Sequence, residues 1–195
     1  MQWLIGLVGF SLVSAGTPGP NNVLLWASGA TFGLRRTLPH IIGTAFGIGA
    51  MALAVAAGVG LLVTSIPALT VLMKLVGSAY LLVLAYRITR AASADETTVS
   101  RPMNVVEAST FQALNPKGWI FAFGAVTTFR PPELPPIAGS VAVAATMMAV
   151  ILPCAAAWAA MGGTMSRLLS GERAGRAVSL VLGGLVALSV IAVWL

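Results

Sequence analysis

The chain has very few charged residues. Of its 195 residues, 58% are hydrophobic and only 8% are charged, whereas soluble domains carry roughly 25% charged residues. This deficit excludes a water-soluble globular domain. The eleven basic residues lie in short stretches beside apolar runs and form no basic stripe with interleaved aromatics. We therefore expect them to meet the headgroups of a lipid bilayer, and we expect no nucleic-acid partner.

Cysteine and histidine occur once each. A single cysteine, Cys154, cannot form an internal disulfide, and its apolar neighbours indicate a packing role. One histidine and five scattered acidic residues cannot assemble the ligand clusters or acid–base pairs of metalloproteases and related membrane enzymes. The sequence therefore predicts neither an enzyme nor a bound metal or other cofactor.

Carboxylates are missing from the middle of every apolar run. Four of the five acidic residues fall in polar connections, and the fifth lies near the end of a run: Asp95, Glu96, Glu133, Glu172 and Glu107. A carboxylate proton relay is therefore not expected. His40, just after Pro39 at one end of a run, remains the candidate for proton coupling. The alternative is an incidental histidine at the membrane interface.

Six apolar stretches are long enough to cross a hydrocarbon core of ~30 Å. The first has no positively charged leader, which indicates a membrane segment and not a signal peptide. We predict one all-α integral membrane domain over residues 1–195, with Pro39 and Pro67 each preceding a helix. A polar cytoplasmic loop at about 87–104 would separate a first repeat (about 1–90) from a second (about 105–195). The predicted spans are 3–30, 41–64, 68–86, 106–129, 137–161 and 174–194.

The arginines are distributed asymmetrically between the two sides of this arrangement. One side would carry Arg35, Arg36, Arg87, Arg90, Arg101, Arg167, Arg173 and Arg176. The opposite side would carry only Arg130. Because cytoplasmic loops are enriched in basic residues, we predict that both termini lie outside.

Two proline motifs interrupt the first and fourth spans, at 16–22 and 114–118. Irregular backbone at membrane depth is tolerated where it lines a cavity, and matched breaks in two halves mark transporter binding sites. The spacing from Pro20 to Pro39 equals that from Pro116 to Pro135, 19 residues in each case. This favours two inverted three-helix repeats over chance placement of prolines.

The depth of the breaks follows from helical rise. Pro20 precedes Arg35 by 15 residues and Pro116 precedes Arg130 by 14, which corresponds to about 21–23 Å. Each break is therefore predicted near the bilayer midplane, where two helix N-termini would face a common region. Helix N-termini present free N–H groups and a positive dipole end, which favours an anion such as a carboxylate.

The first motif supplies Thr17, Pro18, Gly19, Pro20, Asn21 and Asn22 as predicted binding residues. Helix capping occupies at most one of Asn21 and Asn22, so at least one amide is free for a substrate amine or carboxylate. Thr17 is expected to satisfy backbone groups freed by the prolines, with substrate contact as the alternative. The second motif supplies Asn115 and Pro116. Asn115 either caps the following helix or contacts substrate.

Lys117 is the most unusual of the predicted site residues. It lies in the first turn of a helix, where the dipole disfavours a cation, and at membrane depth, where a lysine is costly. One partner that would offset this cost is an anion that binds and leaves. The alternative is a structural lysine that donates to backbone carbonyls of the break. Lys74, in the outer half of the third span, either extends to the outer surface or lines the transport pathway.

The Gly29-x-x-x-Gly33 and Gly43-x-x-x-Gly47 patterns are typical of closely packed helices. They indicate a compact bundle, and the small-residue faces are compatible with a homodimer.

Three segments together resemble the LysE/RhtB family of bacterial amino-acid exporters: 17–22, 74–81 and 115–117. The resemblance extends over essentially the whole chain. It implies a protein of the cytoplasmic membrane, with about six helices, that expels amino acids or close derivatives using the proton gradient. The 28–33 continuation is most similar to members that export cysteine and O-acetylserine. Other members export lysine, arginine, threonine, homoserine or leucine.

The sequence thus favours a secondary exporter that works by alternating access at a midplane site. Since the predicted pocket contains no acidic residue, we expect neutral zwitterions in preference to lysine or arginine. Two alternatives remain. The same scaffold would suit another small carboxylate, an anion or a metal ion, and a membrane scaffold without transport would leave the two polar breaks unexplained.

Overall fold

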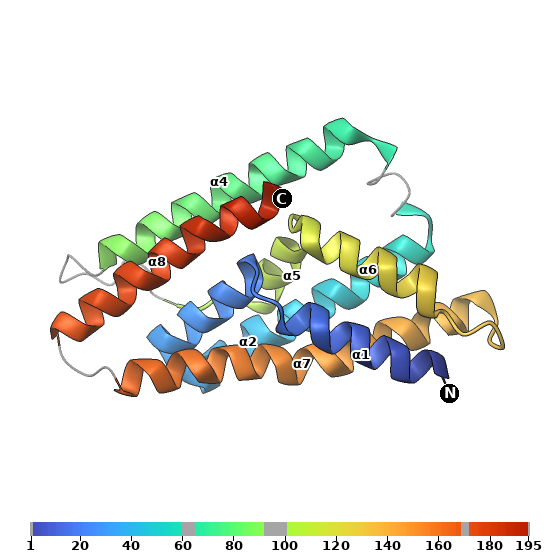
Figure 1. Ribbon diagram of the computed structural model, residues 1–195, viewed down its shortest axis with the longest axis horizontal. Helices are drawn as coiled ribbons and strands as arrows, with labels where there is room; N and C mark the ends of the chain where they lie inside the picture. The colour runs from blue at the N-terminus through green and yellow to red at the C-terminus, as the bar shows by residue number, and fades with distance from the viewer. Residues whose placement is uncertain (1, 60–64, 92–100, 169–171, 195) are drawn as a thin grey trace.

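The computed structural model describes residues 2–59, 65–91, 101–168 and 172–194. All regular structure within these ranges is helical (Figure 1). The helices are α1 (Gln2–Gly16), α2 (Pro20–Ala56), α4 (Pro67–Ala91), α5 (Val105–Ala113), α6 (Pro116–Phe129), α7 (Pro136–Leu168) and α8 (Glu172–Trp194). The predicted all-α class is therefore confirmed. Asp95 and Glu96 lie outside the described residues.

The chain leaves the helical conformation at both proline motifs. Gly19, between α1 and α2, is extended with φ −175° and ψ 173°. Asn115, between α5 and α6, has φ −94° and ψ 106°. In both cases the ring of the next proline excludes the helical conformation for the residue before it. Pro20 and Pro116 then begin the next helix, where a missing N–H leaves no acceptor unpaired.

Helix α2 doubles back on itself at Gly33. This glycine has φ 76° and ψ 164°, a backbone conformation that L side chains rarely adopt. The hydroxyls of Ser28 and Thr37 are 3.0 Å apart, although nine residues of straight helix would separate them by about 13 Å. The helix therefore consists of two antiparallel arms, 20–32 and 34–56.

This reversal corrects two sequence predictions. Gly33 was expected to pack against a neighbouring helix, but a Cβ there would meet nothing within 4 Å, so the glycine is needed for its backbone conformation. Pro39 was expected to precede its helix, but it lies inside the second arm. In addition, Arg35 and Arg36 are helical and do not form an extended loop.

Close approach between helices occurs at the other predicted glycines. A Cβ on Gly29 would collide with the backbone of Ala159 in α7. A Cβ on Gly43 would lie 2.5 Å from the carbonyl oxygen of Val105 in α5, and one on Gly47 would lie 2.9 Å from the side chain of Gln112. The absence of these side chains lets both arms of α2 pack directly on α5 and α7.

The remaining helices are arranged around α2. Helices α4 and α8 lie side by side as an antiparallel pair, and α7 runs along α2 (Figure 1). Helix α5 begins with a capping box, in which Glu107 and Asn104 exchange hydrogen bonds at 2.9 Å. Arg101 pairs with Glu107 at 2.6 Å, and this carboxylate raises the pKa of the exposed Arg101 guanidinium.

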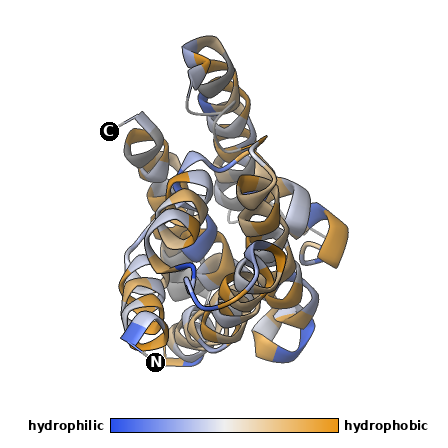
Figure 2. Ribbon diagram, turned by 90° about the vertical axis from the view of Figure 1, so that its right-hand side faces the viewer, coloured by the Kyte–Doolittle hydropathy of each residue, from blue (hydrophilic) through white to orange (hydrophobic). Residues whose placement is uncertain are grey.

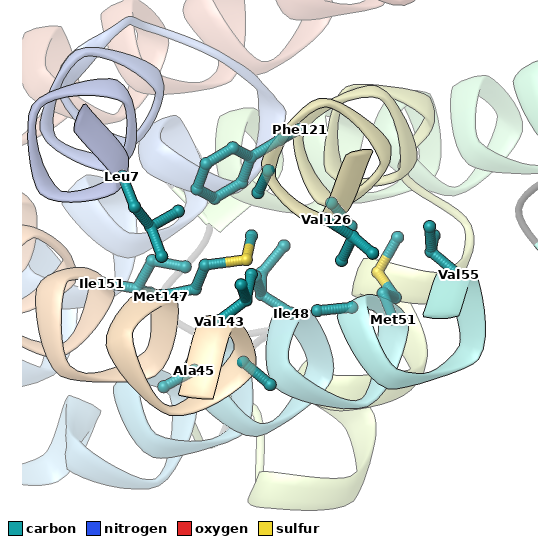
Figure 3. Close-up of a cluster of buried hydrophobic side chains, with 14 residues drawn as sticks. Leu7, Ala45, Ile48, Met51, Val55, Phe121, Val126, Val143, Met147 and Ile151 are labelled. Atoms are coloured by element: carbon teal, nitrogen blue, oxygen red, sulfur yellow. The ribbon is translucent and has the colours of Figure 1, made fainter. Parts of the chain in front are cut away.

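The main hydrophobic core lies between α1, α2, α6 and α7 (Figure 3). Leu7, Met51 and Met147 are among its buried members. Large apolar side chains are also exposed outside this core: Ile5 is 74% exposed and Ile137 is 81% exposed. Figure 2 shows hydrophobic residues around the periphery of the helices as well as within the bundle. An apolar exterior of this kind is suited to lipid.

Two of the described helices, α2 and α7, are long and apolar enough to cross a membrane by length and composition. Three shorter segments are also apolar: Gln2–Gly16, Val71–Val83 and Leu180–Ile191. Because α2 folds into two arms and the proline motifs divide two predicted spans, the number of helices differs from the number of predicted spans. The count of six spans stays a prediction.

Candidate functional site

A cavity of about 60 Å³ lies where the two breaks meet. One enclosed water needs roughly 10–15 Å³, so the cavity has room for several waters. Its lining is Ser14, Ala15, Gly19, Pro20, Asn21, Asn22, Thr44, Ile48, Gln112, Asn115, Lys117, Gly118, Phe121 and Ile151. Six predicted site residues are thus brought together, and this lining contains no carboxylate. Thr17, Pro18 and Pro116 stand beside the cavity in the chain but do not line it.

Side chains satisfy the carbonyl groups at the end of α1. The side-chain amide of Asn22 donates to the carbonyl of Ala15 at 2.7 Å and to that of Thr17 at 2.9 Å. The indole N–H of Trp158 also donates to Ala15, at 3.2 Å. The Thr17 hydroxyl donates to the carbonyl of Val13 at 2.6 Å, which also accepts the backbone N–H of Thr17 at 3.0 Å. The last carbonyls of a helix have no intrahelical partner, and here they acquire side-chain partners from Thr17, α2 and α7.

Lys117 joins the two breaks. Its Nζ donates to the carbonyl of Thr17 at 2.8 Å and to that of Pro18 at 3.4 Å. The lysine starts from a helix N-terminus, which disfavours a cation, and reaches the C-terminal end of α1, which favours one. Of the two partners expected from the sequence, the structure therefore contains the backbone carbonyls. They belong to the other break, about 100 residues away in the chain.

Gly19 provides the room for this contact. A Cβ on Gly19 would lie 3.1 Å from both Cδ and Nζ of Lys117. The extended backbone of Gly19 is accessible to any residue, so what a side chain here would disturb is the position of the Lys117 side chain and not the backbone.

Asn115 occupies the N-cap position of α6, but its side chain forms no capping hydrogen bond. Its Nδ2 donates to Oε1 of Gln112 at 3.2 Å. Its Oδ1 is buried and has no donor among the residues that the structure describes. A buried acceptor without a partner costs about 1–3 kcal/mol. Asn115 is 7% exposed and thus brings an unsatisfied acceptor to the cavity lining.

The N-terminus of α2 also has no side-chain cap. The Oδ1 of Asn21 accepts a hydrogen bond from the hydroxyl of Thr44 at 3.4 Å, across the two arms. Helix capping therefore occupies neither of the two asparagines. Asn22 binds the carbonyls that precede the break, and Asn21 contacts the returning arm.

Sequence reasoning missed Ser14, Thr44 and Gln112, which also line the cavity. Gln112 offered a signal, because it is a polar residue in an apolar run and lies three positions before Asn115. Such a spacing places two side chains on one helix face. Thr44 offered no comparable signal, since only the reversal at Gly33 brings it back to the first arm.

The two predicted pathway residues lie outside the cavity lining. His40 is 1% exposed, and neither ring nitrogen has a hydrogen-bond partner among the described residues. The imidazole is therefore enclosed in the bundle. Lys74 places Nζ 5.6 Å from the ring centroid of Trp194, a cation–π geometry on the α4–α8 pair. Within the described ranges, no group of three metal-ligating side chains occurs.

An apolar helical exterior, and a cavity with several polar side chains in its lining between two proline-broken segments, are features of a membrane transport protein. Residues 12–195 match the family described as LysE type translocator, and the chain belongs to that family. This is a family of translocators and not of enzymes, and it is the family that the sequence motifs indicated.

Two curated relatives of the chain share the name cysteine/O-acetylserine efflux protein. The chain is 30% identical over 125 residues to the cysteine/O-acetylserine efflux protein of Salmonella choleraesuis (strain SC-B67), an alignment that spans 64% of each protein. It is 26% identical over 174 residues to the protein of the same name from Escherichia coli (strain K12), covering 89% of this chain and 88% of the relative. No solved structure matches the chain.

Proposed function

We propose that the protein is a secondary exporter of amino acids or close derivatives across the bacterial cytoplasmic membrane. The observation that carries this proposal is a cavity bordered both by the N-termini of α2 and α6 and by Lys117. A cargo carboxylate is attracted there by free N–H groups and two positive dipole ends. Family membership supports translocation, and the names of the relatives support a small amino acid such as cysteine or O-acetylserine.

The cargo's ammonium needs acceptors of its own. Among the described residues, the amide oxygen of Asn115 has no donor, and that of Asn21 accepts one weak bond, at 3.4 Å. Because the lining contains no carboxylate, a second positive charge on the cargo would be uncompensated. Neutral zwitterions are therefore preferred over lysine and arginine.

The topology of the proposed exporter has six spans. Helix α1 with the first arm of α2 forms span one, and the second arm forms span two. Helices α5 and α6 form span four, and α4, α7 and α8 form spans three, five and six. The two broken spans belong to inverted repeats, both termini lie outside, and the repeats rock about the cavity in alternating access driven by protons. The matched breaks at Pro20 and Pro116 support this arrangement.

The test is an extracellular amino-acid profile of cells that overexpress the protein. Wild type is expected to raise at least one neutral amino acid in the medium, and Asn115→Ala is expected to abolish this rise. The matched control is Arg101→Gln, an exposed residue outside the cavity lining, which should export like wild type. Export of lysine or arginine in preference, or no export at all, would refute the proposal.

Proton coupling has a separate test in inverted membrane vesicles, in which the exporter would carry the amino acid into the vesicle. A protonophore should stop uptake of the amino acid identified above. Unchanged uptake would indicate facilitated diffusion in place of proton-driven export.

A further inference from the structure

The ammonium of Lys117 lies in a position suited to a cationic ligand. It is held by the carbonyls of Thr17 and Pro18, at the negative end of the α1 dipole. These are two carbonyls of the broken segment, beside the cavity that we assign to the cargo. A cargo ammonium that enters the cavity therefore finds this place already taken by an ammonium of the protein itself.

Among the carbonyls at the end of α1, that of Ala15 is satisfied by groups that cannot readily leave. Ala15 is held by the amide of Asn22 and the indole of Trp158, both fixed on helices. Lys117 differs because its ammonium is at the end of a flexible side chain that reaches across from α6. Gly19 leaves space along that side chain. Lys117 is thus the exchangeable partner of the α1 carbonyls.

We propose, resting on the exporter function above, that Lys117 is an internal substitute for the cargo's ammonium. When an amino acid binds, its ammonium replaces Nζ on the carbonyls of Thr17 and Pro18, and Lys117 turns to the cargo's carboxylate. The number of cation–carbonyl contacts is conserved in this exchange, and one ion pair is gained. No covalent bond changes and no proton needs to move.

The exchange explains how a site without an acidic residue selects a zwitterion. An amine without a carboxylate would drive the Lys117 ammonium into the cavity with no counter-ion, which is costly away from water. An acid without an ammonium would draw Lys117 away and leave the carbonyl of Pro18 without its donor. Only a ligand that carries both groups satisfies both partners.

Cargo binding would also change the contact between α6 and α1. At rest, Lys117 links α6 to the end of α1, and these helices belong to different proposed repeats. Bound cargo removes this direct link and replaces it with one that runs through the amino acid. Release of the cargo on the other side then restores the link.

The test uses purified full-length protein in detergent, with ligand-induced stabilisation against heat as the measurement. The probes are L-cysteine, cysteamine, which lacks the carboxylate, and 3-mercaptopropionate, which lacks the ammonium, all with a reductant present. Wild type should be stabilised by L-cysteine alone. In Lys117→Met the carbonyl of Pro18 loses its donor, and that of Thr17 keeps only the amide of Asn22. Cysteamine should therefore now stabilise the protein, and the apparent Kd for L-cysteine should rise at least tenfold.

Two further variants make the result interpretable. Lys74→Met is the matched control, since it makes the same substitution on the α4–α8 pair outside the cavity lining and should keep the wild-type ligand profile. Lys117→Gln keeps a neutral donor for the carbonyls. It should also respond to cysteamine, and it replaces Lys117→Met if the apolar side chain prevents folding.

Two outcomes overturn the exchange. One is stabilisation of wild type by cysteamine or 3-mercaptopropionate as well as by L-cysteine. The other is a pair of Lys117 variants with the wild-type ligand profile. Failure of the exporter function is distinguishable from both, because cells that overexpress the wild type would then release no amino acid.

Discussion

Replacing Asn22 by alanine removes the contact that holds the first break together. The side-chain amide bridges from the start of α2 to the carbonyls of Ala15 and Thr17, at 2.7 and 2.9 Å. The substitution deletes both hydrogen bonds and leaves the helix free to begin at Pro20. We therefore expect the geometry of the break to loosen while the bundle stays folded.

The size of the effect follows from these two bonds. A hydrogen bond contributes about 0.5–1.5 kcal/mol net, which gives about 1–3 kcal/mol for the pair. Ala15 keeps Trp158 as a donor and Thr17 keeps Lys117, so neither carbonyl is left without a partner. The lower part of this range applies, and we expect a loss in unfolding free energy of about 1–2 kcal/mol.

The matched control is Asn104→Ala. Asn104 caps α5 through a 2.9 Å bond from the backbone of Glu107, and losing such a cap costs about 0.5–2 kcal/mol. It is exposed and does not line the cavity. Both variants should therefore lose a similar amount of stability in thermal unfolding followed by tryptophan fluorescence. Only Asn22→Ala should lose amino-acid export at equal membrane abundance.

Two results for Asn22→Ala and Asn104→Ala would contradict these expectations. Equal export by the two variants would mean that the geometry of the first break does not matter for transport. A stability loss in Asn22→Ala much larger than in Asn104→Ala would mean that the amide holds the fold and not only the break.

Two other predictions concern the bundle. Gly29→Ala should lower the unfolding free energy by about 1–3 kcal/mol, the usual cost of overpacking, because the new Cβ would meet the backbone of Ala159. Its control is Gly9→Ala, where no described atom lies within 4 Å of the new Cβ. This variant should be neutral or slightly stabilising in the same thermal assay. His40→Leu should keep or raise stability, since it removes two buried nitrogens that have no partner in the described part of the chain. Loss of export in a well-folded His40→Leu protein would instead assign the histidine a role in transport.

The sequence predicted those parts of the fold that depend on local chemistry. Proline restricts its own φ and the conformation of the residue before it, whatever surrounds them. The interruptions before Pro20 and Pro116 were therefore readable from the chain alone. The close packing at Gly29, Gly43 and Gly47 was also predicted, because a small residue permits backbone approach wherever a partner helix is present.

Other predictions were wrong because one local sequence pattern is compatible with two different structures. Gly33 belongs to the same kind of motif as Gly43, yet it turns the chain and does not pack. Glycine is suited to both roles, and only the position of the returning arm distinguishes them. Similarly, an asparagine before a proline is a typical cap, but Asn115 bonds to Gln112.

By itself, the sequence determined the family, the apolar exterior, the two breaks and the anomaly of a lysine at a helix N-terminus, because composition and proline geometry act over a few residues. Tertiary structure decided which groups the ammonium of that lysine contacts. The carbonyls that bind Lys117 are separated from it by 99 and 100 residues, and a contact of that range depends on how the helices pack. The same packing brings Thr44 and Gln112 to the cavity and removes His40 from it.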